Sequence, residues 1–158
     1  MQHFETFMKV IESLEREGVQ YILIGGYAVI IHGFNRFTQD MVICVQMEST
    51  NIESLRAALD NVFHDESLME ISAEEIEQYP VIRYGSPDGF LVDIIGRMGD
   101  AYRYEDLEYE TVMIEGKAIR VATPDTLYRM KISTVRPKDH QDAEFLKYLI
   151  ESRNCLEA

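Results

Sequence analysis

The chain has 158 residues, 46% of them hydrophobic and 27% charged, a balance typical of a soluble globular protein. Its 15 Lys and Arg against 28 Asp and Glu give a net charge of −13 at pH 7, which disfavours tight DNA binding because phosphate backbones are repelled. No apolar run approaches the roughly 20 residues needed to cross a membrane, the N-terminus has no secretory-signal pattern, and two cysteines without metal-ligand spacing fit a reducing compartment, so a cytoplasmic protein is expected.

The first expected element is an amphipathic helix over residues 2–17, because apolar side chains recur there at three- and four-residue steps. Gly18 is expected to end it. A buried strand follows over residues 19–24, then a Gly-Gly turn and a short apolar helix over residues 26–32. A second apolar strand is expected over residues 41–45.

Turn and capping residues divide the rest of the chain. The run Ser49-Thr50-Asn51 is expected to cap a helix that ends near Phe63, and the acidic, irregular residues 64–80 contain one helical turn over 73–78. The absence of a repeat or linker predicts a single domain of mixed α and β over residues 1–158. The remaining expected elements are strands over 81–84 and 89–95 joined at Gly85-Ser86-Pro87-Asp88, a hairpin of residues 109–114 and 117–121, a helix over 124–135 capped by Thr123, and a last helix over 138–152.

The Gly25-Gly26 pair, between a strand and a helix, is the first candidate for chemistry. Glycines let a ligand approach the backbone closely, and the following helix offers free N–H groups and the positive end of its dipole to a phosphate. The alternative is that the pair only makes a tight turn.

Asp40 directly precedes an apolar strand, where a ligand-facing carboxylate would stand. Strand alternation puts Asp40 and Val42 on the same face. A two-metal site for phosphoryl transfer needs carboxylates at both positions, and valine cannot bind a metal. Asp40 is either half of such a site or an ordinary strand-start carboxylate.

Asp93 interrupts the otherwise apolar run Phe90–Ile95. Taking a carboxylate out of water costs several kcal/mol unless it is paired or bound to a metal. Asp93 is therefore expected to have either a functional role or a structural ion-pair partner.

Charged residues also lie on the inward faces of the last two expected helices. Lys131 follows Leu127 by four residues, and Asp139 and Asp142 share the apolar stripe of the last helix. Asp139 and Asp142 are therefore predicted to form a polar network with Lys131 and Arg136. This network would be catalytic, would hold the two helices together, or both. His32, on the apolar helix after the glycines, is interpreted as a satisfied core histidine rather than a general base.

These segments together resemble the minimal nucleotidyltransferases of the DNA polymerase beta superfamily, and within it the branch of the abortive-infection toxins and their single-domain relatives. The resemblance covers roughly residues 19–149. It rests on four motifs in order: Leu23-Ile24-Gly25-Gly26, Arg36-Phe37-Thr38-Gln39-Asp40, Leu91-Val92-Asp93, and Lys131 with Arg136-Pro137-Lys138-Asp139 and Asp142.

The resemblance implies an α+β fold with a mixed β-sheet flanked by helices. It also implies Mg²⁺ and a nucleoside triphosphate (NTP) as substrate, with transfer of a nucleoside monophosphate to a hydroxyl of a protein, RNA or small molecule. The implied roles are triphosphate binding by Gly25, Gly26, Arg36, Thr38 and Lys131, metal binding by Asp40 and Asp93, and catalysis by Asp40, Asp93 as base and Lys131.

Val42 stands where the family has its second metal-binding carboxylate, and this departure leaves two main hypotheses. One is a nucleotidyltransferase-fold enzyme whose activity is weakened or lost. The other is a non-catalytic module that uses the fold for binding. A third, from the resemblance alone, is the toxin of a toxin–antitoxin pair. A protein partner of the chain would be a second copy, in a homodimer, or an antitoxin.

Overall fold

The computed structural model describes residues 2–98, 102–131 and 137–157. Among these residues it contains a six-stranded mixed sheet, a two-stranded ribbon and six α-helices. In chain order the elements are α1 (Gln2–Arg16), β1 (Tyr21–Ile24), α2 (Gly25–Ile31), β2 (Asp40–Val45), α3 (Ser49–Phe63), the 3-10 helix η1 (Glu66–Glu70), α4 (Ala73–Gln78), β3 (Ile82–Gly85), β4 (Leu91–Ile95), β5 (Arg97–Met98), β6 (Tyr102–Arg103), the 3-10 helix η2 (Tyr104–Asp106), β7 (Tyr109–Ile114), β8 (Lys117–Ala122), α5 (Pro124–Lys131) and α6 (Pro137–Glu157).

The large sheet has the strand order β3-β4-β2-β1-β8-β7. Its inner pairs are β1 with β2, antiparallel, and the parallel pairs β2 with β4 and β1 with β8. The hairpins β3–β4 and β7–β8 extend it at either side. The fold class is therefore α+β with a mixed sheet, as the resemblance implied.

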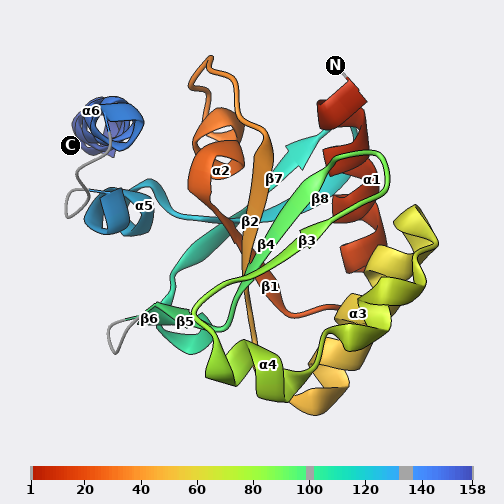
Figure 1. The fold of residues 1–158 in the computed structure, drawn as a ribbon. Coiled ribbons are helices and arrows are strands. Elements are labelled where there is room, and N and C mark those ends of the chain that lie inside the picture. Colours follow the sequence, from red (N-terminus) through yellow and green to blue (C-terminus); the bar gives the residue numbers. More distant parts are fainter. Residues whose placement is uncertain (1, 99–101, 132–136, 158) are drawn as a thin grey trace.

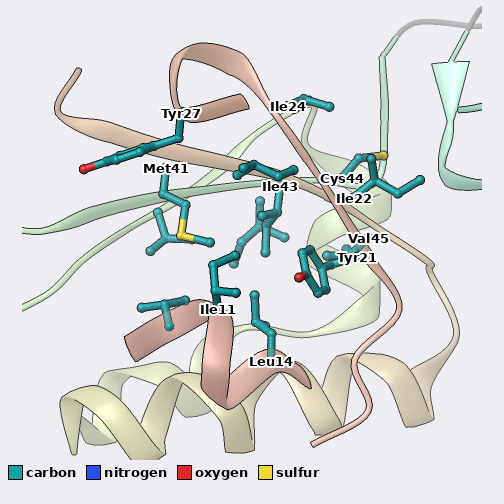
Figure 2. Packing of buried hydrophobic residues seen from close by; sticks show 14 of the residues in the cluster. Ile11, Leu14, Tyr21, Ile22, Ile24, Tyr27, Met41, Ile43, Cys44 and Val45 are labelled. Atoms are coloured by element: carbon teal, nitrogen blue, oxygen red, sulfur yellow. The ribbon is translucent and has the colours of Figure 1, made fainter. Parts of the chain in front are cut away.

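Helices cover both sides of this sheet (Figure 1). Helices α1 and α3 pack together on one side, and α2, α5 and α6 lie on the other. Every residue of β1 is buried, as expected for a central strand covered on both faces. Ile11 and Leu14 of α1 point at the sheet, where they meet Tyr21, Met41 and other side chains of β1 and β2 (Figure 2).

Most expected elements occur within a few residues of their expected bounds. The 109–114 and 117–122 hairpin turns at Glu115-Gly116, and Thr123 caps α5, its Oγ1 accepting a hydrogen bond from the Thr126 N–H at 3.2 Å. Helix α6 extends to Glu157, beyond the expected end at 152. The expected helix over 124–135 is α5 as far as Lys131, and residues 132–136 lie outside the described residues.

The expected N-cap of α3 was wrong. The cap position is Glu48, which makes no side-chain cap hydrogen bond, and Asn51 lies within the first turn. The Asn51 side chain is buried and bonds the backbone of Gln20 and Gln46 instead. Long-range contacts outcompeted the local cap because they satisfy three backbone groups rather than one.

No helix in the described part of the chain is both long and apolar enough to span a bilayer.

Candidate functional site

The turn between β1 and α2 is a tight one that only glycine permits. Gly25 has φ +76°, in the left-handed region, and a Cβ there would lie 2.9 Å from Val42 Cγ2. A Cβ on Gly26 would lie 2.7 Å from Arg36 Nη1 and 2.8 Å from Thr38 Oγ1. The backbone of the turn is thus in direct contact with Val42, Arg36 and Thr38, all of which follow α2 in the chain.

The strand pairing brings Asp40 and Asp93 to the same part of the sheet. Strand β2 runs parallel to β4, with Val42 opposite Asp93 and Asp40 opposite Leu91. Asp40 and Val42 are half-buried and alternate with the fully buried Met41 and Ile43, as the expected alternation required. Since Val42 contacts Gly25 and is in register with Asp93, the position for which the resemblance implies a further carboxylate lies at the centre of this arrangement.

Arg83 of the edge strand β3 binds both carboxylates. Its Nε donates to Asp93 Oδ1 at 2.7 Å, and its Nη2 donates to Asp93 Oδ2 at 3.0 Å and to Asp40 Oδ2 at 2.9 Å. The antiparallel register of β3 and β4 places Arg83 directly opposite Asp93. Asp93 is only 8% exposed, so its charge is compensated by this fork-shaped pair rather than by water. The hydrogen bond and charge of Asp93, with the charge of Asp40, raise the pKa of Arg83 further above its ordinary high value.

Tyr27, in the first turn of α2, lies close enough to Asp40 for that charge to affect the pKa of its hydroxyl. Its ring is stacked on Phe7 of α1 with centroids 4.3 Å apart, and it is almost fully buried. Burial, and secondly the charge of Asp40, raise the pKa of its hydroxyl to about 12. Tyr27 is therefore neutral at physiological pH and is not suited to act as a base.

Arg36 lies between the glycine turn and the last helix. Its Nη1 donates to Asp142 Oδ2 at 3.1 Å, and Asp142 is fully buried on α6. The inward position of Asp142 was expected, but Arg36 was not the expected partner. The expected partners Lys131 and Arg136, and the side chain of Asp139, lie outside what the structure describes: of Lys131 only its place at the end of α5 is known.

His32 forms a separate cluster at the end of α2. Its Nε2 lies 2.8 Å from the carbonyl oxygen of Ala122, and its Nδ1 lies 3.6 Å from Glu110 Oε1, which also pairs with Arg153. Burial lowers the pKa of the ring, more than the Ala122 bond and the Glu110 charge raise it. A neutral ring donating from Nε2 to Ala122 is a satisfied core histidine.

The predicted site residues therefore form two groups. Gly25, Gly26, Arg36 and Thr38 lie together at the turn, and Asp40 and Asp93 lie together on adjacent strands next to Val42, which joins the groups. The residue that sequence reasoning missed is Arg83. Little in the sequence indicated its role. With the expected loop over residues 85–88, Arg83 would lie opposite Phe90 in the hairpin, whereas in the structure it lies opposite Asp93.

The residues of this site do not fit the Mg²⁺ site that the resemblance implies. Val42 offers no ligand atom, and both carboxylates are already bound by Arg83. Among the described residues no group of three or more His, Cys, Asp or Glu could hold a metal ion. The two-metal arrangement of phosphoryl transfer needs more ligands than these.

No protein-family model matches this sequence, and no curated protein matches it either. Solved structures match it at low identity. ANT(2")-Ia, in complex with adenylyl-2"-tobramycin, aligns with a TM-score of 0.59 at 12% identity over 98% of this chain and 92% of that one. The lincosamide antibiotic adenylyltransferase LnuA, lincomycin-bound, aligns with a TM-score of 0.56 at 13% identity over 90% and 95%.

A third match, JHP933 from Helicobacter pylori, has a TM-score of 0.50 at 17% identity and covers 92% of this chain. This chain spans only 64% of JHP933. At these identities the likeness is one of fold. The chain has a nucleotidyltransferase-like fold, in agreement with the resemblance seen in its motifs.

Proposed function

We propose that this chain binds a nucleoside triphosphate at the Gly25-Gly26 turn and has little or no ability to transfer its nucleoside monophosphate to a hydroxyl acceptor. The observation that carries the proposal is the place of Val42. It contacts Gly25 and stands opposite Asp93, so an apolar side chain fills the centre of the site, where the chemistry needs a third carboxylate.

The binding half of the proposal rests on the residues around the turn. Thr38 Oγ1 and the Arg36 guanidinium lie beside Gly26, where a hydroxyl and a cation can contact a triphosphate. The strong negative charge of the whole chain does not oppose this, because short-range donors at a local site outweigh distant charges screened by salt.

Titration calorimetry with ATP, GTP, CTP and UTP, each with and without Mg²⁺, tests the binding half. We expect heat with at least one of them and a loss of about tenfold or more in affinity for Thr38→Val, since a hydrogen bond to a charged group is worth roughly 1.5–3 kcal/mol. Thr111→Val, the same change at an exposed position of β7, is the matched control and should bind like the wild type. The absence of heat with all four nucleotides would refute binding.

Transfer of a labelled nucleotide tests the catalytic half. We expect no transfer, or very slow transfer, by the wild type and a gain of metal-dependent transfer when Val42→Asp is combined with Arg83→Gln, because Arg83 binds the other two carboxylates. A wild type that transfers rapidly, and loses this activity in Asp93→Ala, would show instead that the chain is an active nucleotidyltransferase.

A second candidate, a protein-interaction module that binds no nucleotide, is favoured by the same Val42 and by the net charge of −13. It would be distinguished by the calorimetry above, in which none of the triphosphates would bind. The acceptor of any transfer, whether protein, RNA or small molecule, and a toxin role with an antitoxin partner are predictions from the resemblance.

A further inference from the structure

The carboxylates of Asp40 and Asp93, at the centre of this site, need a compensating positive charge. Asp93 is 8% exposed and the Asp40 side chain is 32% exposed, and both come from strands that lie next to each other in the sheet. A buried carboxylate without a partner costs several kcal/mol, and two neighbouring ones repel each other as well. Something positive must therefore lie between them.

Arg83 supplies that charge with a geometry that uses the fork of its guanidinium. Nε and Nη2 bind the two oxygens of Asp93 side by side, and Nη2 also reaches Asp40. The 2.7–3.0 Å distances are those of charge-assisted hydrogen bonds. One cation thus bridges two carboxylates from different strands, which is what a divalent metal ion does in a two-carboxylate site.

The backbone holds Arg83 in this place. It lies opposite Asp93 in the β3–β4 pairing, and its neighbour Tyr84 is buried, with its hydroxyl donating to Asp65 at 2.8 Å. Alternation along the strand then directs Arg83 to the face that carries Asp93. Its side chain is still 54% exposed, so a dissolved cation could reach the pair and compete with it.

We propose that Arg83 takes the place of the divalent cation at Asp40 and Asp93, so that the site excludes Mg²⁺ and Mn²⁺. The inference concerns the site of the proposed function and deepens it: any nucleotide bound there binds without a metal ion. With valine at position 42 the site lacks one metal-binding carboxylate, and Arg83 occupies the other two, Asp40 and Asp93. Both features weaken the binding of a divalent cation.

Mn²⁺ binding, followed by the loss of the free-ion EPR signal, tests this directly. We expect no binding by the wild type at submillimolar Mn²⁺ and an affinity at least about tenfold higher in Arg83→Gln, in which both carboxylates are free. The double variant Arg83→Gln with Val42→Asp should bind more tightly still. Arg16→Gln, which removes an exposed arginine on α1, is the matched control and should behave like the wild type.

Arg83→Gln leaves Asp93 without a cation and could unfold the chain, so two further measurements keep the test decisive. Arg83→Lys keeps the positive charge and should still exclude Mn²⁺. In the wild type, the NMR signal of the Arg83 Nε–H, identified by its absence in Arg83→Lys, should not move when Mg²⁺ is added.

Mn²⁺ binding by the wild type that is lost in Asp93→Asn, or a shift of the Arg83 signal on adding Mg²⁺, would overturn the inference. The calorimetry separates this from the proposed function. Nucleotide binding that requires Mg²⁺ would refute the role of Arg83 and leave nucleotide binding standing. Metal exclusion without nucleotide binding would refute the proposed function and leave the role of Arg83 standing.

Discussion

Asn51 joins three chain segments through one side chain. Its Oδ1 accepts from the Gln20 N–H at 2.7 Å, and its Nδ2 donates to the carbonyls of Gln20 at 3.1 Å and Gln46 at 2.8 Å. It is 6% exposed, so water cannot replace these bonds. The side chain thereby fixes the start of α3 against the entry to β1 and the exit from β2.

We expect Asn51→Ala to lower the free energy of unfolding by about 3 kcal/mol, because three buried backbone groups lose their partner. Urea denaturation measures this. Asn61→Ala is the matched control: Asn61 is exposed and its Nδ2 donates to Glu17, so its loss should cost no more than about 0.5 kcal/mol. Equal effects of the two substitutions would show that the Asn51 bonds are not responsible.

His32 makes stability depend on pH. Burial lowers its pKa in the folded state below the value of about 6.5 for an unfolded chain. Below that value the unfolded chain binds a proton at His32 that the folded chain resists, so the free energy of unfolding should fall as the pH drops from about 7.5 to about 5. Thermal unfolding across this range should show the fall, and His32→Gln should reduce it.

The control for this prediction is Asn61→Ala, at an exposed position without a titratable side chain. It should leave the pH dependence between neutral and mildly acidic pH as it is in the wild type. A fall that persists unchanged in His32→Gln would mean that other groups cause it.

At the scale of elements, an ion pair and a ring stack among the described residues dock α6 on the segment after α2. The buried ion pair of Arg36 and Asp142 joins them, and the rings of Phe34 and Phe145 stack with centroids 4.9 Å apart. Helix α6 therefore contacts the same Arg36 that lies against Gly26. A shift of this helix should change the position of Arg36 at the glycine turn.

We expect Asp142→Ala to lower the free energy of unfolding by on the order of 3 kcal/mol, since it leaves the largely buried Arg36 without this partner. Glu144→Ala, at an exposed position of the same helix, should change it by less than about 0.5 kcal/mol. Chemical denaturation of both variants checks this. A small effect of Asp142→Ala would mean that the ion pair is dispensable for docking α6.

At the scale of the whole molecule, the net charge of −13 weakens the binding of other polyanions such as DNA. We expect it to bind duplex DNA more weakly than the roughly 10⁻⁴–10⁻⁶ M of ordinary non-specific binding at physiological salt, because it has few cations with which to displace counterions. Fluorescence anisotropy of a labelled duplex measures this. Micromolar affinity would reveal a basic surface that the overall charge conceals.

Much of the architecture could be predicted because its signals are local. The apolar spacing of α1, the glycines at its end and at the β1–α2 turn, and the Thr123-Pro124 start of α5 each depend on neighbours within a few residues. The positions of Asp40, Val42 and Asp93 in their strands followed from the same kind of pattern. The motifs in order then indicated the fold.

The partners of the charged residues could not be predicted in this way. Arg83 is ten residues from Asp93 and 43 from Asp40, and Arg36 is 106 from Asp142. The contacts of Arg83 depend on the β3–β4 hairpin, whose loop spans residues 86–90 rather than the expected 85–88. This difference changes which residues lie opposite each other across the hairpin. The sequence by itself determined most of the helices and strands of the main sheet, the fold class and the absence of a carboxylate at position 42, but not the β5–β6 ribbon. Only the tertiary structure decided that Arg83 fills the space between the two remaining carboxylates, because strand register and helix docking are settled by packing across the whole chain.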